Sequence, residues 1–279
     1  MAETPDSGYS ARTSQEDAVG QPKLVDTLTV RRFINKTRSV IYGTMLGDSY
    51  IMSRGTGSAL RVLHAEDQKD LVMHKYEIFR KVAPTPPRSF PHEKWGQPKW
   101  YFWTACDVEW QKVWSIFHQN CRTYRWNGQN VRYKVVTKQI LKEVDDLGLA
   151  MWIMDDGSYT YGHQDLPPYQ PMNVFRLHTN GYTYDENLLI VRWLKDRYDV
   201  SATILNVTGK LKSGALRQYH VIRIGWREFE KITKRVKRFV IPSMQHKIGA
   251  GPLQDKRQLE TIELKTRSEL HGNVQSCQK

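Results

Sequence analysis

Two aspartates, Asp48 and Asp156, each follow an apolar stretch with helical spacing, IYGTMLGDS over 41–49 and LAMWIMDDG over 149–157. The C-terminal end of a helix carries unsatisfied carbonyls and a partial negative charge, and both favour a bound cation. Hard divalent cations prefer oxygen ligands. Two such helix ends, brought together, would place two carboxylates around shared metal ions, which is an arrangement suited to in-line attack on a phosphodiester.

The elements that would position these aspartates occur twice along the chain, in the same order. Each half predicts an apolar helix, strands, an amphipathic helix, strands and a last helix. The paired landmarks, besides the apolar stretches, are Leu63-His64 with Leu177-His178, the alternating strands 100–104 with 219–224, and the Glu-aromatic-x-Lys segments 109–112 with 228–231. This order indicates two related halves in one chain.

The charge of the chain points to a polyanionic partner. There are 42 Lys and Arg against 29 Asp and Glu, which gives a formal net charge of +13. Such an excess attracts DNA and RNA alike. No apolar run is long enough to cross a bilayer and the N-terminus lacks a secretory signal, so we expect no membrane partner and an intracellular protein, in a bacterial cytoplasm or an organelle.

Composition also divides the chain into four parts. Residues 1–30 are polar and are expected to form a disordered arm, and residues 251–279 a C-terminal tail. Residues 31–140 and 141–250 are expected to form the two repeats. Three cysteines without a C-x-x-C pair argue against a disulfide framework and a four-ligand zinc site.

The two apolar stretches resemble the two copies of the nonapeptide LAGLIDADG, the signature of a homing endonuclease family. The resemblance covers about residues 36–250. It implies an α+β fold of two pseudo-symmetric αββαββα repeats, with the motif helices packed at the pseudo-two-fold axis and saddle-shaped antiparallel sheets in the DNA major groove. It also implies a monomer that cuts double-stranded DNA at a long asymmetric site with Mg²⁺ or Mn²⁺.

The same resemblance assigns roles to residues of the motifs. It makes Asp48 and Asp156, the last acids of the two motifs, the metal ligands. Gly47 and Asp155 precede them and are supporting candidates, because the family uses the backbone carbonyl at this position. One departure concerns helix packing: Gly43 supplies the small third residue of the first motif, but the second motif has a methionine there, so close packing is expected to depend on Ala150 or on an adjusted crossing.

A basic residue late in each half is a further feature of the family, where it helps to organise the attacking water. Lys134 and Lys247 stand at similar distances from the two motif acids. We therefore expect both to take part in catalysis, although a phosphate contact or a solvated lysine is the competing interpretation for each.

Contacts with DNA are expected from the strands, whose side chains can reach base edges and phosphates in the major groove. The candidates are Arg54, Arg61, Arg176, Lys210, Lys212, Arg217, Arg223, Gln170, Asn173 and Gln218.

Two other functions use the same fold. One is a maturase that binds intron RNA and assists splicing, and the other is a DNA-binding regulator without catalysis. Both tolerate loss of the motif acids, whereas this sequence has Asp48 and Asp156. Their presence favours the endonuclease.

Overall fold

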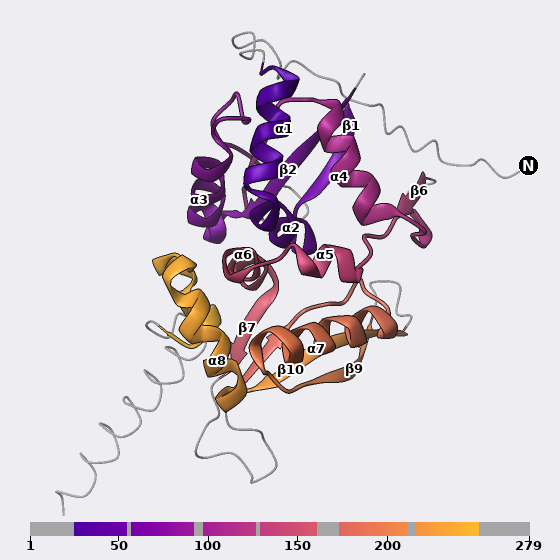
Figure 1. Ribbon diagram of the computed structural model, residues 1–279, viewed down its shortest axis with the longest axis vertical. Coiled ribbons are helices and arrows are strands. Elements are labelled where there is room, and N and C mark those ends of the chain that lie inside the picture. The colour runs from indigo at the N-terminus through magenta and orange to yellow at the C-terminus, as the bar shows by residue number, and fades with distance from the viewer. Residues whose placement is uncertain are drawn as a thin grey trace, which may run out of the picture.

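The computed structural model describes residues 25–54, 57–91, 97–126, 129–160, 173–210 and 216–250. These form two halves, one above the other in Figure 1. The first half contains α1 (Thr27–Lys36), α2 (Arg38–Leu46), β1 (Tyr50–Arg54), β2 (Gly57–Ala65), η1 (Glu66–Gln68), α3 (Lys69–Phe79), β3 (Arg88–Phe90), β4 (Lys99–Trp103), α4 (Val108–His118), β5 (Thr123–Trp126) and β6 (Gln129–Arg132). The second contains α5 (Lys138–Lys142), α6 (Asp146–Asp156), β7 (Gly157–Thr160), β8 (Val174–Leu177), α7 (Tyr184–Tyr198), β9 (Ala202–Lys210), β10 (Leu216–Gly225), α8 (Trp226–Val236), η2 (Lys237–Phe239) and η3 (Pro242–Ile248).

Each half has a four-stranded antiparallel sheet, and the two sheets share one strand order. The orders are β1-β2-β4-β3 and β7-β8-β10-β9. The chain from α2 to α4 and the chain from α6 to α8 therefore both read αββαββα, which confirms the predicted duplicated α+β fold. Between the halves, β5 and β6 form a separate hairpin.

Among the described residues, the helices that contact each sheet pack on one of its faces. In β2, Leu60, Val62 and His64 are buried, whereas Arg61 and Leu63 between them are partly exposed. This alternation is the period of a strand with one face in the core. The buried face packs on α3 and α4 in the first half, and the corresponding face of the second sheet packs on α7 and α8. The other face of each sheet is left open.

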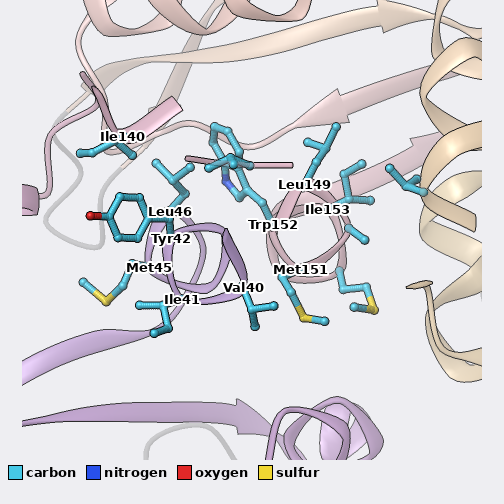
Figure 2. Packing of buried hydrophobic residues seen from close by; sticks show 14 of the residues in the cluster. Val40, Ile41, Tyr42, Met45, Leu46, Ile140, Leu149, Met151, Trp152 and Ile153 are labelled. Carbon is cyan, nitrogen blue, oxygen red and sulfur yellow. The ribbon is translucent and has the colours of Figure 1, made fainter. Parts of the chain in front are cut away.

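The two motif helices, α2 and α6, lie side by side at the centre of the molecule (Figure 1). Both are apolar on all sides, as expected of helices buried all round: residues 40–46 and 148–155 are all buried. Their side chains pack into one core (Figure 2). Asp145 caps the N-terminus of α6, because its carboxylate accepts the N–H groups of Leu147 and Gly148.

The N-terminal boundary of the folded part differs from the expected one. The N-terminal arm was expected to reach residue 30, but α1 begins at Thr27, because the Asp26 carboxylate caps it by accepting the Thr29 N–H. The C-terminal tail, 251–279, lies outside the described residues. Within the described ranges, no helix is long and apolar enough to cross a membrane.

Strand register corrects one of the paired landmarks. Arg61 lies opposite Tyr50, the first residue of β1, and Arg176 lies opposite Ser158 in β7. Because Tyr50 and Ser158 both stand two residues after a motif aspartate, Arg61 and Arg176 are equivalent. His64 is then equivalent to Thr179, not to His178 as the sequence pairing predicted. A shift of one residue moves a side chain to the other face of a sheet.

Candidate active site

The motif helices approach each other through two glycines. A Cβ atom added to Gly43 would lie 1.9 Å from the Gly148 carbonyl oxygen, and one added to Gly148 would lie 2.5 Å from the Ser39 carbonyl oxygen. Backbone therefore touches backbone. The small residue that meets Gly43 is Gly148, just before the motif, where Ala150 or an adjusted crossing was expected. The third position of the second motif itself holds Met151.

The C-terminal ends of the two helices meet beside the two motif acids. The Asp48 N–H donates to Asp155 Oδ2 at 3.2 Å, so the end of one motif touches the end of the other. The Asp48 side chain is half exposed. Asp156 is partly buried, and its Oδ2 accepts a hydrogen bond from the Trp152 indole N–H at 3.2 Å. The two motif ends are therefore in contact, and the binding of a shared cation by Asp48 and Asp156 stays a prediction.

Negative charge accumulates where the acids meet. Burial, followed by the nearby charges of Asp48 and Asp155, raises the pKa of Asp156 to about 8, although Lys134 and Lys247 act in the opposite direction. Burial is the largest cause of this rise in pKa, and repulsion from the carboxylates of Asp48 and Asp155 adds to it. A cation between them would relieve this repulsion.

Lys134 and Lys247 hold equivalent positions in the two halves. The Lys134 ammonium donates to the Gly47 carbonyl and, at 3.2 Å, to the Ser49 carbonyl. The Lys247 ammonium donates to the Asp155 carbonyl at 2.6 Å. Gly47 and Asp155 occupy the same motif position, so each lysine contacts the carbonyl that precedes a motif acid. Burial lowers the pKa of both lysines, and the three nearby aspartates oppose this.

The donors present suit a hard divalent cation. Asp48 and Asp156 offer carboxylate oxygens, and the carbonyls of Gly47 and Asp155 each have a second lone pair beside the one used by lysine. Within the described residues, no group of three or more His, Cys, Asp or Glu side chains forms a metal site. Two carboxylates with backbone oxygens are the available ligand set.

A buried cluster beside Asp48 was missed in the sequence. Lys75 in α3 donates to Asp155 Oδ1 at 2.5 Å, and its Nζ lies 3.4 Å from His64 Nε2. The Lys75 and Asp155 side chains are both completely buried. Burial, followed by the charge of Lys75, lowers the pKa of His64 to about 3, which leaves the imidazole neutral. The available signal was the spacing of this lysine from Leu71 and Val72, which places it on the apolar side of α3.

Arg61 lies on the open face of the first sheet, where a DNA contact was expected. Its guanidinium lies 4.9 Å from the ring centroids of both Tyr101 and Trp103, and it donates to the Tyr50 hydroxyl at 2.8 Å. Aromatic rings that surround an arginine fix its orientation. Arg61 is therefore held rigidly on this surface.

The open face of the second sheet carries Arg176 and Arg223, which are paired across β8 and β10. Arg176 donates to the Thr160 hydroxyl at 2.9 Å. Asn173 precedes β8 and has a backbone φ of 46°. Gln218 lies opposite Thr208 in β10, in phase with Ile222 and Ile224 rather than with Arg223, and its side chain is exposed, so its contact with DNA stays a prediction.

The other expected DNA-contact residues fall wholly or partly outside the described residues. Gln170 and Lys212 lie outside the described residues. The backbones of Arg54, Lys210 and Arg217 belong to β1, β9 and β10, but their side chains lie outside the described part of the structure.

Curated relatives and solved structures resemble this chain at low identity. It is 24% identical over 219 residues to cytochrome b mRNA maturase bI2 of Debaryomyces hansenii, across 75% of this chain and 72% of the relative. It is 23% identical over 231 residues to DNA endonuclease I-ChuI of Chlamydomonas applanata, across 77% and 94% of the two chains.

Among solved structures, the chain is similar to the homing endonuclease I-WcaI bound to its DNA recognition sequence, with a TM-score of 0.56 and 17% identity over 85% of this chain and 96% of that one. At this identity the likeness establishes the fold. The model of the LAGLIDADG DNA endonuclease family matches residues 38–232, which include both motif helices and both sheets. The chain belongs to the LAGLIDADG DNA endonuclease family.

Proposed function

We propose that this chain is a homing endonuclease that cuts double-stranded DNA at a long asymmetric site, as a monomer and with Mg²⁺ or Mn²⁺. The observation that carries the proposal is the meeting of two acid-tipped helices, in which the Asp48 N–H donates to Asp155 and the charges of Asp48 and Asp156 interact. Divalent cations bound there would activate water and stabilise charge on the phosphate.

The residues of the chain supply the binding and the orientation. Asp48 and Asp156 provide one carboxylate from each repeat. Lys134 and Lys247 place an ammonium group beside each acid, where it can orient a water molecule or stabilise negative charge on a phosphate oxygen. Because both lysines are anchored on motif carbonyls, their positions depend on the same helix ends as the acids.

The open sheet faces are the proposed DNA surface. They carry Arg61 in the first half and Arg176 and Arg223 in the second. On the first face, aromatic rings surround Arg61, whereas on the second face Arg176 donates to the Thr160 hydroxyl. The two faces differ from each other, which would match an asymmetric DNA target. The excess of basic residues predicts an affinity for DNA that falls steeply as the salt concentration rises.

The test is cleavage of plasmid DNA that carries a target selected from a random double-stranded library. Wild-type protein is expected to linearise the plasmid with Mg²⁺ and to stop in EDTA. Asp48→Asn and Asp156→Asn should each bind the target but cut it at least about 1000-fold more slowly, because each removes an anionic ligand. Asp199→Asn is the matched control, since Asp199 is exposed and paired with Lys195 and Lys231 on the outer surface.

A maturase is the second candidate, because a curated relative is named as a cytochrome b mRNA maturase. The same preparations distinguish the two functions. Tight binding to intron RNA, with no selected DNA target and no cut in any metal, would favour the maturase and overturn the endonuclease.

A further inference from the structure

The first repeat contains a buried charged cluster at its contact with the second motif helix. Its members are His64 in β2, Lys75 in α3 and Asp155 in α6, and their exposed fractions are 3%, 0% and 6%. Asp155 belongs to the second repeat, so the cluster joins the two halves. The proposed chemistry assigns no role to these three side chains.

The cluster contacts both the backbone and the carboxylate of Asp48. Lys75 binds one oxygen of Asp155 at 2.5 Å, which leaves the other oxygen to accept the Asp48 N–H at 3.2 Å. His64 Nδ1 lies 3.1 Å from Gln68 Oε1 and 3.7 Å from Asp48 Oδ2. The buried lysine therefore orients Asp155, and Asp155 in turn holds the end of the first motif.

Stability alone does not account for a buried ion pair at this position. Desolvation offsets much of the attraction between two buried charges, and apolar residues of similar size are often at least as stabilising. The pair also demands a glycine on the opposite helix, because a Cβ atom on Gly47 would lie 2.2 Å from Asp155 Oδ2. Lys75 and Gly47 are therefore both needed for the hydrogen bond that Asp155 accepts from the Asp48 N–H.

Asp156 has a different support. Its carboxylate accepts from Trp152 of its own helix. Gly47, which occupies the motif position of Asp155, has no side chain to reach the Asp156 backbone. The residue equivalent to His64 is Thr179, which binds Asn187 at 2.5 Å. The second repeat thus has a neutral pair in place of the charged cluster.

We propose that Asp155, anchored by Lys75, is a positioning residue that fixes Asp48 across the pseudo-two-fold axis. The two motif acids are then held by different contacts, Asp48 by Asp155 and Asp156 by Trp152. Loss of the cluster is expected to change the relative rates at which the two DNA strands are cut. This catalytic consequence rests on the proposed function. The position of the Asp48 backbone is a consequence that does not depend on cleavage.

The variant that tests this is the double substitution Lys75→Met/Asp155→Leu. It removes both charges and retains the approximate side-chain shapes, so no unpaired charge is left in the core. Tyr182→Phe is the matched control, because the Tyr182 hydroxyl makes another buried contact between the halves, to the Leu46 carbonyl at 2.7 Å. Should the double variant not fold, Asp155→Asn, which retains the shape and loses the charge, serves the same two measurements.

The first measurement is hydrogen exchange of the Asp48 amide by NMR, without DNA. Loss of a hydrogen bond to a charged acceptor is expected to accelerate this exchange by about tenfold or more relative to wild type and to Tyr182→Phe. The second is cleavage of a target labelled on each strand. The ratio of the two strand rates is expected to change by about tenfold, because a small displacement of a metal ligand slows chemistry strongly.

The outcomes separate this inference from the proposed function. An unchanged Asp48 amide would overturn the inference. So would a variant that slows both strands equally in a protein whose wild type cuts DNA, since that result indicates a structural role only. If the wild type cuts no target, the proposed function fails, and the amide measurement still decides whether Asp155 positions Asp48.

Discussion

The two motif helix ends offer similar groups to a cation but are supported in different ways. Each presents a carboxylate, Asp48 or Asp156, and each has a lysine on the preceding carbonyl. Asp48 is half exposed and is held from the opposite repeat by Asp155, whereas Asp156 is more buried and bonded to its own helix. The two repeats thus place their acids at the same motif position and support them with different contacts.

The largest expected effect concerns the buried charged cluster of His64, Lys75 and Asp155 that supports Asp48. Lys75→Met leaves Asp155 buried without its partner and is expected to lower the free energy of unfolding by about 3–5 kcal/mol. Lys75→Met/Asp155→Leu removes both charges and should stay within about 1 kcal/mol of wild type. Urea denaturation measures both, and equal destabilisation by the two variants would contradict the account of an ion pair.

The glycine contact between the repeats should give a slightly smaller effect. Gly43→Ala places a methyl group against the Gly148 carbonyl and forces the helices apart, at a cost of about 3 kcal/mol. Gly181→Ala is the control, because nothing lies within 4 Å of a Cβ atom there. Thermal unfolding would compare the two, and similar melting temperatures would show that the helices do not approach so closely.

Cation binding tests whether both repeats contribute to one centre. Ca²⁺ at ten times its dissociation constant should stabilise the wild type by about 1.4 kcal/mol relative to EDTA. Asp48→Asn and Asp156→Asn should both lose most of this gain, whereas Asp199→Asn should keep it. If only one of the two motif variants responded, the acids would not share the cation site.

The smallest effect compares the equivalent arginines of the two open faces. Arg61→Lys loses planar stacking on Tyr101 and Trp103 and should cost about 0.5–1 kcal/mol of stability. Arg176→Lys, which loses one bond to a hydroxyl, should change stability by less than about 0.5 kcal/mol. Chemical denaturation measures the stability of both variants. A loss in Arg61→Lys no larger than that in Arg176→Lys would show that the aromatic rings around Arg61 contribute nothing.

The repeated pattern was sufficient to predict the element order and the motif helices, because the hydrophobic period identifies helices and strands and the duplication orders them. Lys75 was not identified as buried, since a lysine in an amphipathic helix is ordinarily solvated and its partner, Asp155, lies 80 residues away. Which strand side chains share the face of Arg61 or of Arg176 could not be predicted, because the phase of a strand depends on its register. Contacts across the axis, such as Gly43 with Gly148, depend on packing that a single sequence does not specify.

The central claim is that two acid-tipped helix ends share bound cations. Anomalous diffraction from crystals of the protein with its DNA target and Mn²⁺ tests it most directly. The account predicts Mn²⁺ between the repeats, coordinated by carboxylate oxygens of both Asp48 and Asp156. Mn²⁺ bound elsewhere, with both carboxylates free of metal, would contradict it.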